Sequence, residues 1–128
     1  MLKAVCGPDY SLIKVVDGAE GKCVCELAVT QELTNVRGML HGGTTALLVD
    51  SISTMALLTK TDNIPGVSVN MNISYIKSAP LGSEIVVNAQ TLHVGRKLAF
   101  LTVDITNKVD GSLIAQGTHT KYVGQTKS

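Results

Sequence analysis

The most constraining feature of this chain is a long apolar segment, HGGTTALLVDSISTMALLTK, which has no Gly or Pro after the triplet His41-Gly42-Gly43. Its apolar residues cover most of the circumference of a helix, which is typical of a helix buried inside a domain. A single charged residue, Asp50, interrupts the segment nine residues after His41. Burying a carboxylate in such a helix is costly unless the carboxylate has partners or a function. Asp50 is therefore the first candidate for chemistry.

Length and composition indicate one globular domain. With 128 residues the chain can bury a proper core, and we expect a single domain over residues 1–128. Hydrophobic residues make up 45% and charged residues 16%, which favours a globular over a disordered chain. The formal net charge of +1 and the low aromatic content of 3% argue against a nucleic-acid partner.

The cysteines and the N-terminal residues bear on the cellular compartment. Cys6, Cys23 and Cys25 are odd in number and form a C-x-C pattern, so we expect neither a disulfide framework nor a metal site. The first residues contain neither the apolar core of a signal peptide nor an Arg-rich presequence. The apolar run from Thr44 to Leu58 is shorter than the ~20 residues that span a bilayer. We therefore expect an intracellular protein, cytoplasmic or mitochondrial, with no integral membrane segment.

Periodicity predicts one helix and several strands. The helix is expected from about Gly42 to about Lys60, with turns at 17–21 and 62–66. Alternating residues, and a tight turn at Asp110-Gly111, predict the strands Lys22–Val29, Val67–Tyr75, Glu84–His93, Lys97–Lys108 and Ser112–Tyr122. One helix followed by four strands joined largely by hairpins indicates an α+β fold, in which an antiparallel β-sheet wraps around one long central helix.

The strand Val67–Tyr75 is predicted to have two different faces. Strict alternation places one apolar set on one face, namely Val67, Val69, Met71, Ile73 and Tyr75. The other face then carries a polar row, namely Ser68, Asn70, Asn72 and Ser74. We expect this row to meet water, a ligand or another subunit.

His41 and Asp50 are the obvious acid–base candidates, and helix geometry keeps them apart. Nine helical residues separate them by about 13 Å along the axis and by half a turn. If the two cooperate, the site must be built across an interface between subunits. Gly42 and Gly43 would leave unpaired N–H groups at the positive end of the helix dipole. That end suits a developing oxyanion, and a carboxylate placed opposite could hold and deprotonate water.

The order of these residues resembles the hotdog-fold acyl-CoA thioesterases. The motif reads Asn35-x5-His41-Gly42-Gly43-x6-Asp50, followed by Gly66-Val67-Ser68-Val69-x-Met71-Asn72. The chain is most similar to the phenylacetate-degradation (PaaI-like) branch, which includes the eukaryotic thioesterase superfamily member two. The likeness runs from about Gly21 to Gly124. It implies a hotdog fold and hydrolysis of acyl-CoA thioesters, and we expect medium- to long-chain fatty acyl groups.

The resemblance implies a catalytic set made of Asp50, Asn35, His41, Gly42 and Ser68. By this likeness the Gly42 N–H polarises the thioester carbonyl, Asn35 binds it and His41 supports the arrangement. Asp50 of the facing subunit activates water as general base, helped by Ser68. The resemblance also implies a homotetramer, a dimer of dimers, with no cofactor and no metal, since acyl-CoA is the substrate.

The resemblance also implies where CoA binds. The expected CoA-binding residues are Gln31, Gly66, Tyr75, Ile76, Lys77, Ser78, Ala79, Pro80, His93, Val94, Gly95, Arg96, Lys97, Leu98 and Tyr122. Three of them, Lys77, Arg96 and Lys97, lie in loops beside predicted strand ends, where they could meet the CoA phosphates.

Other interpretations remain open. A dehydratase or hydratase acting on acyl thioesters would also pair a histidine with a carboxylate, and a non-catalytic acyl-CoA-binding module would share the fold. Asp50 could be a helix carboxylate hydrogen-bonded at a dimer contact, and His41 a helix-cap histidine with a structural hydrogen bond. His93 and His119 are otherwise expected to be ordinary surface or sheet residues, and the cysteines to be inert.

Overall fold

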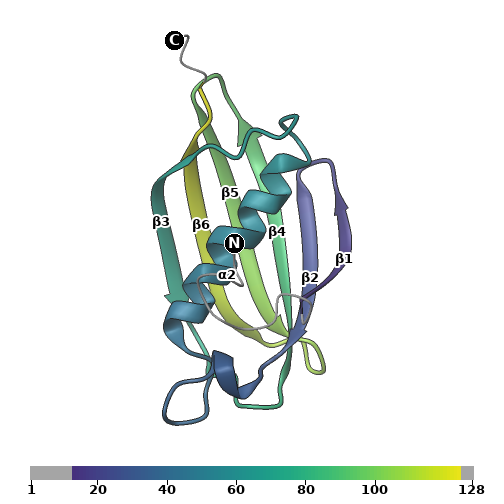
Figure 1. The fold of residues 1–128 in the computed structure, drawn as a ribbon, viewed down its shortest axis with the longest axis vertical. Helices are drawn as coiled ribbons and strands as arrows, with labels where there is room; N and C mark the ends of the chain where they lie inside the picture. Colours follow the sequence, from purple (N-terminus) through teal and green to yellow (C-terminus); the bar gives the residue numbers. More distant parts are fainter. Residues whose placement is uncertain (1–12, 125–128) are drawn as a thin grey trace.

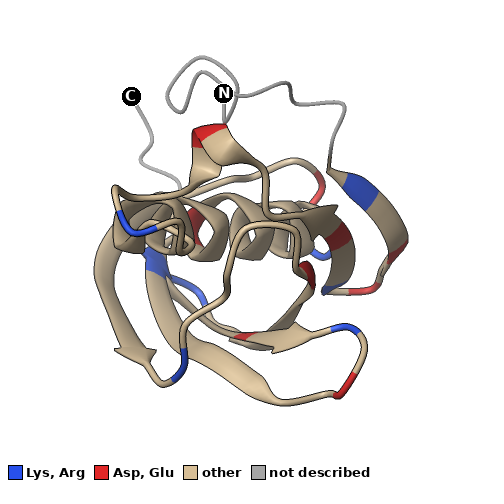
Figure 2. Cartoon of the chain, turned by 90° about the horizontal axis from the view of Figure 1, so that it is seen from below, with Lys and Arg blue, Asp and Glu red and all other residues tan. Residues whose placement is uncertain are grey.

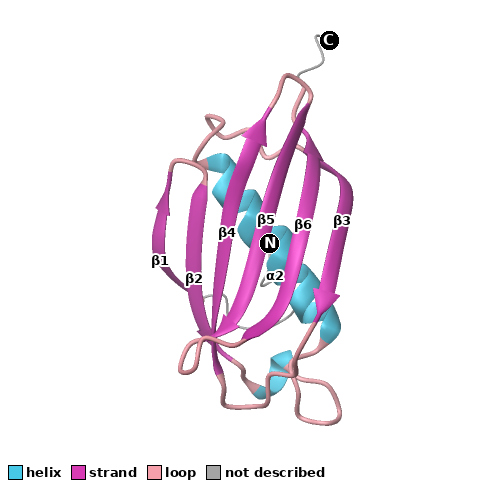
Figure 3. Ribbon diagram, turned by 180° about the vertical axis from the view of Figure 1, so that it is seen from behind, coloured by secondary structure: helices cyan, strands magenta, loops and turns pink. Residues whose placement is uncertain are grey.

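In the computed structural model, which describes residues 13–124, one long helix lies across the concave face of a curved sheet (Figure 1). The elements are β1 (Lys14–Ala19), β2 (Lys22–Ala28), the 3-10 helix η2 (Gln31–Leu33), α2 (Gly42–Leu58), β3 (Val67–Tyr75), β4 (Glu84–Val94), β5 (Leu98–Asn107) and β6 (Leu113–Tyr122). The strand order is β1-β2-β4-β5-β6-β3, and every neighbouring pair is antiparallel. Seen from behind, the six strands cover the helix (Figure 3). The predicted α+β architecture is confirmed.

The apolar side of α2 and the inner face of the sheet form the core. The helix buries Leu48, Val49 and Ile52. The strands facing it contribute Ile85, Val87, Ala89, Val103 and Ile105. Alternate residues of these strands are buried, as the period of two for a sheet with one covered face requires. Each large buried side chain stabilises the fold by roughly 1.5–3 kcal/mol.

The helix packs very closely on β6. A Cβ atom at Gly117 would lie 2.9 Å from Cγ1 of Val49, so this approach of helix to strand requires a glycine. Asp50 follows Val49 on the helix, and His119 lies two residues after Gly117 on the strand. The glycine contact therefore sets the distance between helix and strand where these two side chains meet.

The N-terminal strand corrects the sequence prediction. A turn was predicted over 17–21, whereas β1 continues to Ala19 and the turn is made at Glu20 and Gly21, with φ of 55° and 86°. β1 is an edge strand whose residues are all exposed, so it has no buried face that alternation could reveal. The helix ends at Leu58, two residues before the predicted Lys60.

A bulge in β3 corrects the predicted alternation. Ser68 pairs with Lys121 and Asn70 pairs with Thr120, so Val69 is an extra residue without a partner in the register. Residues directly opposite in an antiparallel pair have their side chains on the same face. Ser68 therefore shares the inner face with Lys121, whereas Asn70 lies on the outer face. The prediction of one continuous polar row is wrong at its first member.

Charges are distributed without a face of one sign, and both signs appear on loops and strand ends (Figure 2). One ion-pair group joins Lys108 to Glu26 at 3.0 Å and to Glu84 at 3.7 Å. Within residues 13–124, no helix is both long and apolar enough to cross a membrane.

Candidate active site

Side-chain contacts hold the start of α2 in place. His41 is the N-cap residue, and its Nδ1 accepts a hydrogen bond from the Gly43 N–H at 2.8 Å. The Tyr75 hydroxyl, at the end of β3, donates to the Gly42 carbonyl at 2.9 Å. Among the described residues the Gly42 N–H has no acceptor. It is one of the donors that the first turn of a helix leaves unpaired.

Asn35 lies in the loop before the helix and closes that loop with its side chain. Its Oδ1 accepts hydrogen bonds from the Arg37 N–H at 2.9 Å and from the Met39 N–H at 3.2 Å. Because the oxygen is used in this way, the amide NH₂ group remains as a donor. Asn35 and His41 line the same open cavity of about 800 Å³. The structure therefore places the amide donor beside the helix start.

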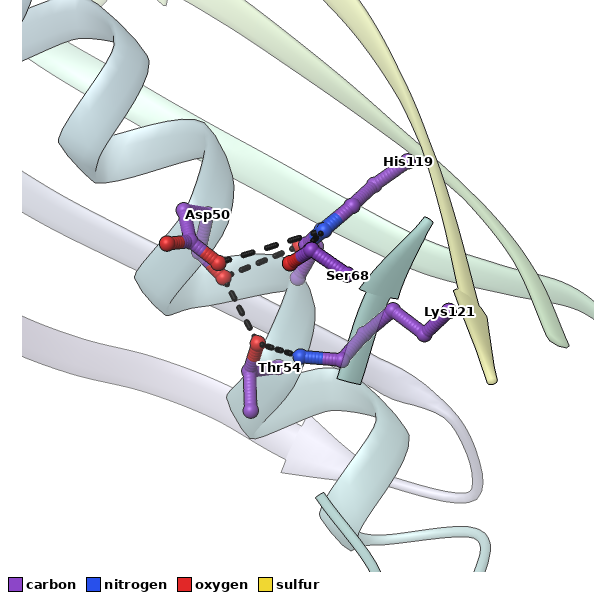
Figure 4. Close-up of polar contacts among 6 residues, drawn as sticks. Asp50, Thr54, Ser68, His119 and Lys121 are labelled. Atoms are coloured by element: carbon purple, nitrogen blue, oxygen red, sulfur yellow. Dashed lines mark hydrogen bonds and ion pairs between the residues drawn. The ribbon is translucent and has the colours of Figure 1, made fainter. Parts of the chain in front are cut away.

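A second polar cluster lies between the middle of α2 and the strands β3 and β6 (Figure 4). The His119 side chain is fully buried, with 0% of its surface exposed. Its Nδ1 lies 2.8 Å from Ser53 Oγ, and its Nε2 lies 2.8 Å from Ser68 Oγ. Asp50 Oδ1 is 3.9 Å from Nε2, which is too long for a hydrogen bond, although its charge still acts on the ring. Helix and sheet thus meet at one imidazole ring.

Lys121 is buried on the same face of β6, two residues beyond the histidine. Its Nζ donates to Thr54 Oγ1 at 2.9 Å, and that hydroxyl donates to the Asp50 carbonyl at 2.8 Å. A buried ammonium group requires partners, and the Asp50 carboxylate is the negative charge that acts on it.

Burial and neighbouring charges set the protonation of both basic groups on β6. Burial, with a smaller effect of the Lys121 charge, lowers the pKa of His119, and Asp50 opposes this shift. Burial also lowers the pKa of Lys121, again against Asp50. His119 is therefore a neutral imidazole at pH 7, with one nitrogen that donates and one that accepts.

Two expectations about this cluster are corrected. Asp50 was expected to be buried, but its side chain is 37% exposed, because it points toward β3 at the edge of the sheet. His119 was expected to be an ordinary surface or sheet residue, but it is buried and contacts Ser53 and Ser68. The phase of alternation could have revealed it, since buried Ala115 lies on the same strand face.

The residues expected to bind CoA form two groups, and the first lies beside the helix start. A cavity of about 240 Å³ there is lined by Gly42 and by residues 75–79. Gln31 lines the neighbouring, larger cavity. Lys77 already has a protein partner, because its Nζ lies 4.0 Å from the Asp110 carboxylate.

The second group lies at the opposite end of the sheet, where Tyr122 pairs with Leu98. Arg96 and Lys97 are exposed in the hairpin between β4 and β5. Gly66 is nearby, and its Cβ would lie 2.7 Å from the Tyr122 carbonyl oxygen at a φ of 69°, so the backbone itself requires glycine. The nine residues of β3 place about 30 Å between the two groups.

The cysteines and acidic residues form no metal centre in the part of the chain that the structure describes. Cys23 and Cys25 are buried free thiols with their Sγ atoms 3.7 Å apart. The hydrogen bond with Cys23, together with burial, raises the pKa of Cys25, which disfavours the reactive thiolate. Cys6 lies outside the described residues.

Known proteins are similar to this chain in sequence and in fold. The sequence model of the thioesterase superfamily matches residues 37–114. Human acyl-coenzyme A thioesterase 13 is 56% identical over 112 residues, which cover 88% of this chain and 80% of the relative. The crystal structure of zebra fish thioesterase superfamily member 2 has a TM-score of 0.88 and 50% identity, covering 96% of this chain and 93% of its own.

A more distant structure extends the comparison to a bacterial protein with a bound molecule. A hypothetical thioesterase from Streptococcus pneumoniae, solved with coenzyme A, has a TM-score of 0.83 and 26% identity. That similarity covers 92% of this chain and 94% of the pneumococcal chain. The sequence match spans the helix start, Asp50 and the strands β3, β4 and β5. This chain therefore belongs to the thioesterase superfamily, whose hotdog fold it shares.

Proposed function

We propose that this thioesterase hydrolyses acyl-CoA thioesters to the free acid and CoA, with Asp50 as the general base that activates water. The carrying observation is the position of the Asp50 carboxylate, partly exposed at the rim of a polar cluster with Ser68 and His119. The name of the human relative and the coenzyme A in the pneumococcal structure support acyl-CoA as the substrate class. Medium- to long-chain fatty acyl groups are the expected acyl part.

The thioester carbonyl is polarised, in this proposal, at the start of α2. The unpaired Gly42 N–H lies at the positive end of the helix dipole. The NH₂ group of Asn35 supplies a second donor, because its oxygen is held by the loop. His41 keeps the first turn in place through its bond to Gly43. Donors of this kind stabilise the tetrahedral oxyanion, and losing one typically costs ~10²–10³ in kcat.

Water bound between Asp50 and Ser68 attacks the carbonyl carbon. Asp50 takes one proton from the water as the new C–O bond forms, and the carbonyl oxygen becomes an oxyanion. Collapse of this intermediate breaks the C–S bond and releases the free acid. The departing CoA thiolate takes the proton from Asp50, which regenerates the carboxylate for the next turnover.

The carbonyl donors and the base come from different subunits in this proposal. His41 caps the helix on which Asp50 lies nine residues later, so about 13 Å of helix separates them. A water held by Asp50 cannot reach a carbonyl held at Gly42 of the same chain, whereas the start of a second α2 could be placed opposite it.

The free edge of the sheet supports such a pairing of subunits. β3 is an edge strand, and among residues 13–124 no strand pairs with the backbone groups on its outer side. Apolar side chains on it are open, with exposed fractions of 68% for Val67, 59% for Val69 and 59% for Tyr75. A second copy at this edge would cover them and would approach Asp50. We propose a dimer built in this way, and a homotetramer as a dimer of dimers.

The two expected CoA-contact groups fit the same composite arrangement. In one chain about 30 Å of β3 separates the segment 75–80 from the hairpin 93–98. We assign the contacts of one CoA to both subunits, with Arg96 and Lys97 toward the phosphates. Lys77 is a weaker candidate for phosphate, because it already lies near Asp110.

The direct test measures release of free thiol from acetyl-, phenylacetyl-, octanoyl- and palmitoyl-CoA by the purified protein. Octanoyl- and palmitoyl-CoA should give the highest kcat/KM. The matched control is Asp50→Asn, which keeps the shape of the side chain but cannot accept a proton. No thiol release from any of the four substrates by folded protein would contradict the proposed function.

A further inference from the structure

His119 is a buried titratable group for which the hydrolytic scheme has no role. Both of its ring nitrogens have a partner at 2.8 Å, Ser53 on the helix and Ser68 on β3. The charged side chains that act on it are Asp50 from α2 and Lys121 from β6. A buried imidazole with both nitrogens engaged has a defined tautomer, and its partners decide which one.

Ser53 decides the tautomer through the single proton of its hydroxyl group. Its Oγ lies 3.1 Å from the Asp50 backbone carbonyl and 2.8 Å from His119 Nδ1. A carbonyl oxygen can only accept, so the contact with Asp50 uses the serine proton. The serine oxygen then accepts from the ring, which places the imidazole proton on Nδ1.

The tautomer in turn determines the direction of the bond to Ser68. Because burial lowers the pKa of His119, the ring is neutral at pH 7 and Nε2 carries a lone pair. Asp50 Oδ1 lies 3.9 Å from Nε2, which is too far for a hydrogen bond. The hydrogen bond at Nε2 is therefore donated by the Ser68 hydroxyl at 2.8 Å.

We propose that His119 is a positioning residue that fixes the Ser68 hydroxyl as a donor to the imidazole, so that Ser68 accepts a hydrogen bond from the attacking water. This inference rests on the proposed function, in which that water reacts between Ser68 and Asp50. One water proton is then directed to Ser68 and the other to Asp50. A lone pair of the water then points to the thioester carbonyl carbon. The chain of hydrogen bonds starts at the backbone carbonyl of Asp50 and passes through Ser53, His119, Ser68 and the water. It ends at the carboxylate of the same residue.

The bulge in β3 is the structural device that makes this contact. Ser68 reaches the inner face only because Val69 is the extra residue in the pairing with β6. Without the bulge, Ser68 would share the outer face with Asn70, and its hydroxyl would point away from His119.

The first test determines the tautomer directly, by ¹⁵N NMR of the His119 ring in the wild-type protein at pH 7. The inference expects a neutral ring with the proton on Nδ1. In Ser53→Ala, which removes the acceptor, a population with the proton on Nε2 should appear. An imidazolium ring, or a wild-type ring with the proton on Nε2, would overturn the inference without a kinetic measurement.

The second test separates the two nitrogens by substitution. The amide of His119→Gln can reach the position of Nε2 and accept from Ser68, whereas the amide of His119→Asn reaches only the position of Nδ1. His119→Asn should lose about 10-fold or more in kcat, the scale of one misdirected hydrogen bond, with KM changed less than about twofold. His119→Gln should recover most of that loss.

Thermal unfolding of both variants shows whether a loss of kcat reflects an altered fold. Equal kcat values for His119→Asn and the wild type would overturn the positioning role. A similar loss in both variants would also overturn it, because the acceptor at Nε2 would then not matter. Asp50→Asn separates a failure of the proposed function from a failure of the inference about His119. If Asp50→Asn remains active, the proposed function fails, and if it is inactive while His119→Asn is fully active, only the inference about His119 fails.

Discussion

The two polar regions of α2 are built in opposite ways. At its start, most side-chain contacts are local: His41 bonds to Gly43 two positions later and Asn35 closes its own loop, while the Tyr75 hydroxyl reaches Gly42 from β3. At its middle, Ser53 bonds to His119 across 66 positions of the chain. The first region is open to solvent and offers backbone donors. The second offers side chains of opposite charge, with His119 and Lys121 buried and Asp50 partly exposed.

This difference reflects the chemistry that each region can supply. Donors for an oxyanion come directly from the first turn of any helix, so a cap and a glycine are sufficient to present them. A base and an oriented water need side chains from separate elements, held at fixed distances in a site of low dielectric constant. Substitutions in the sheet are therefore expected to disturb the middle cluster more than the helix start.

The largest expected effect tests the middle region alone. Asp50→Asn should lower kcat by ~10²–10⁴ while leaving KM almost unchanged, because asparagine cannot take the proton of water. Thiol release under saturating acyl-CoA measures this loss. A variant with more than half of the wild-type kcat would remove Asp50 from the mechanism.

The next effect tests whether the two regions act together across subunits. Asn35→Ala damages one region and Asp50→Asn the other, and each variant alone should be nearly inactive. Co-refolding equal amounts should make half of the dimers mixed, each with one intact site, so activity should return to about a quarter of wild type. No recovery, with mixed dimers confirmed by mass spectrometry, would mean that both residues act within one subunit.

The oligomeric state of the protein gives a second check on the composite site. Sedimentation equilibrium at micromolar concentration should give at least a dimer. A fully active monomer would contradict the composite site, whatever the outcome of mixing.

A smaller effect is expected at the end of the sheet away from the helix start. Replacing Arg96 and Lys97 together with Ala should raise KM for acyl-CoA by about 2- to 10-fold with little change in kcat, as expected for exposed charge contacts. The effect should shrink with an acyl-pantetheine substrate, which lacks the phosphoadenosine. Equal increases for both substrates would show that these side chains do not bind the nucleotide.

The smallest effect concerns stability in the buried region. Because the pKa of His119 is lowered in the folded state, the unfolded chain binds more protons below about pH 6.5. The free energy of unfolding should therefore fall as the pH drops from about 6.5 to the lowered folded pKa, and His119→Gln should remove part of that fall. Denaturant unfolding at several pH values measures it. His93→Gln, at an exposed histidine, is the matched control, and an unchanged slope in His119→Gln would contradict the burial argument.

Much of the fold was predictable because the signals are local. The helix begins at Gly42 as predicted, and β3 has the predicted bounds Val67–Tyr75. Alternation also placed the three long strands that follow, to within one residue at each end. β1 was missed because no residue of an exposed edge strand is buried, and so its sequence carries no alternation.

The sequence by itself determined the components of the site: a capped helix start at His41-Gly42-Gly43 and a carboxylate at Asp50 in an apolar helix. Both follow from residues close together in the chain, where spacing alone defines geometry. Only the tertiary structure decided that Ser68 faces inward, and that His119 lies between it and the helix. The inward face depends on an extra residue in the pairing of β3 with β6, and the contact depends on how closely α2 packs at Gly117. Such non-local pairings depend on all packed elements at once, so no local pattern in the sequence encodes them.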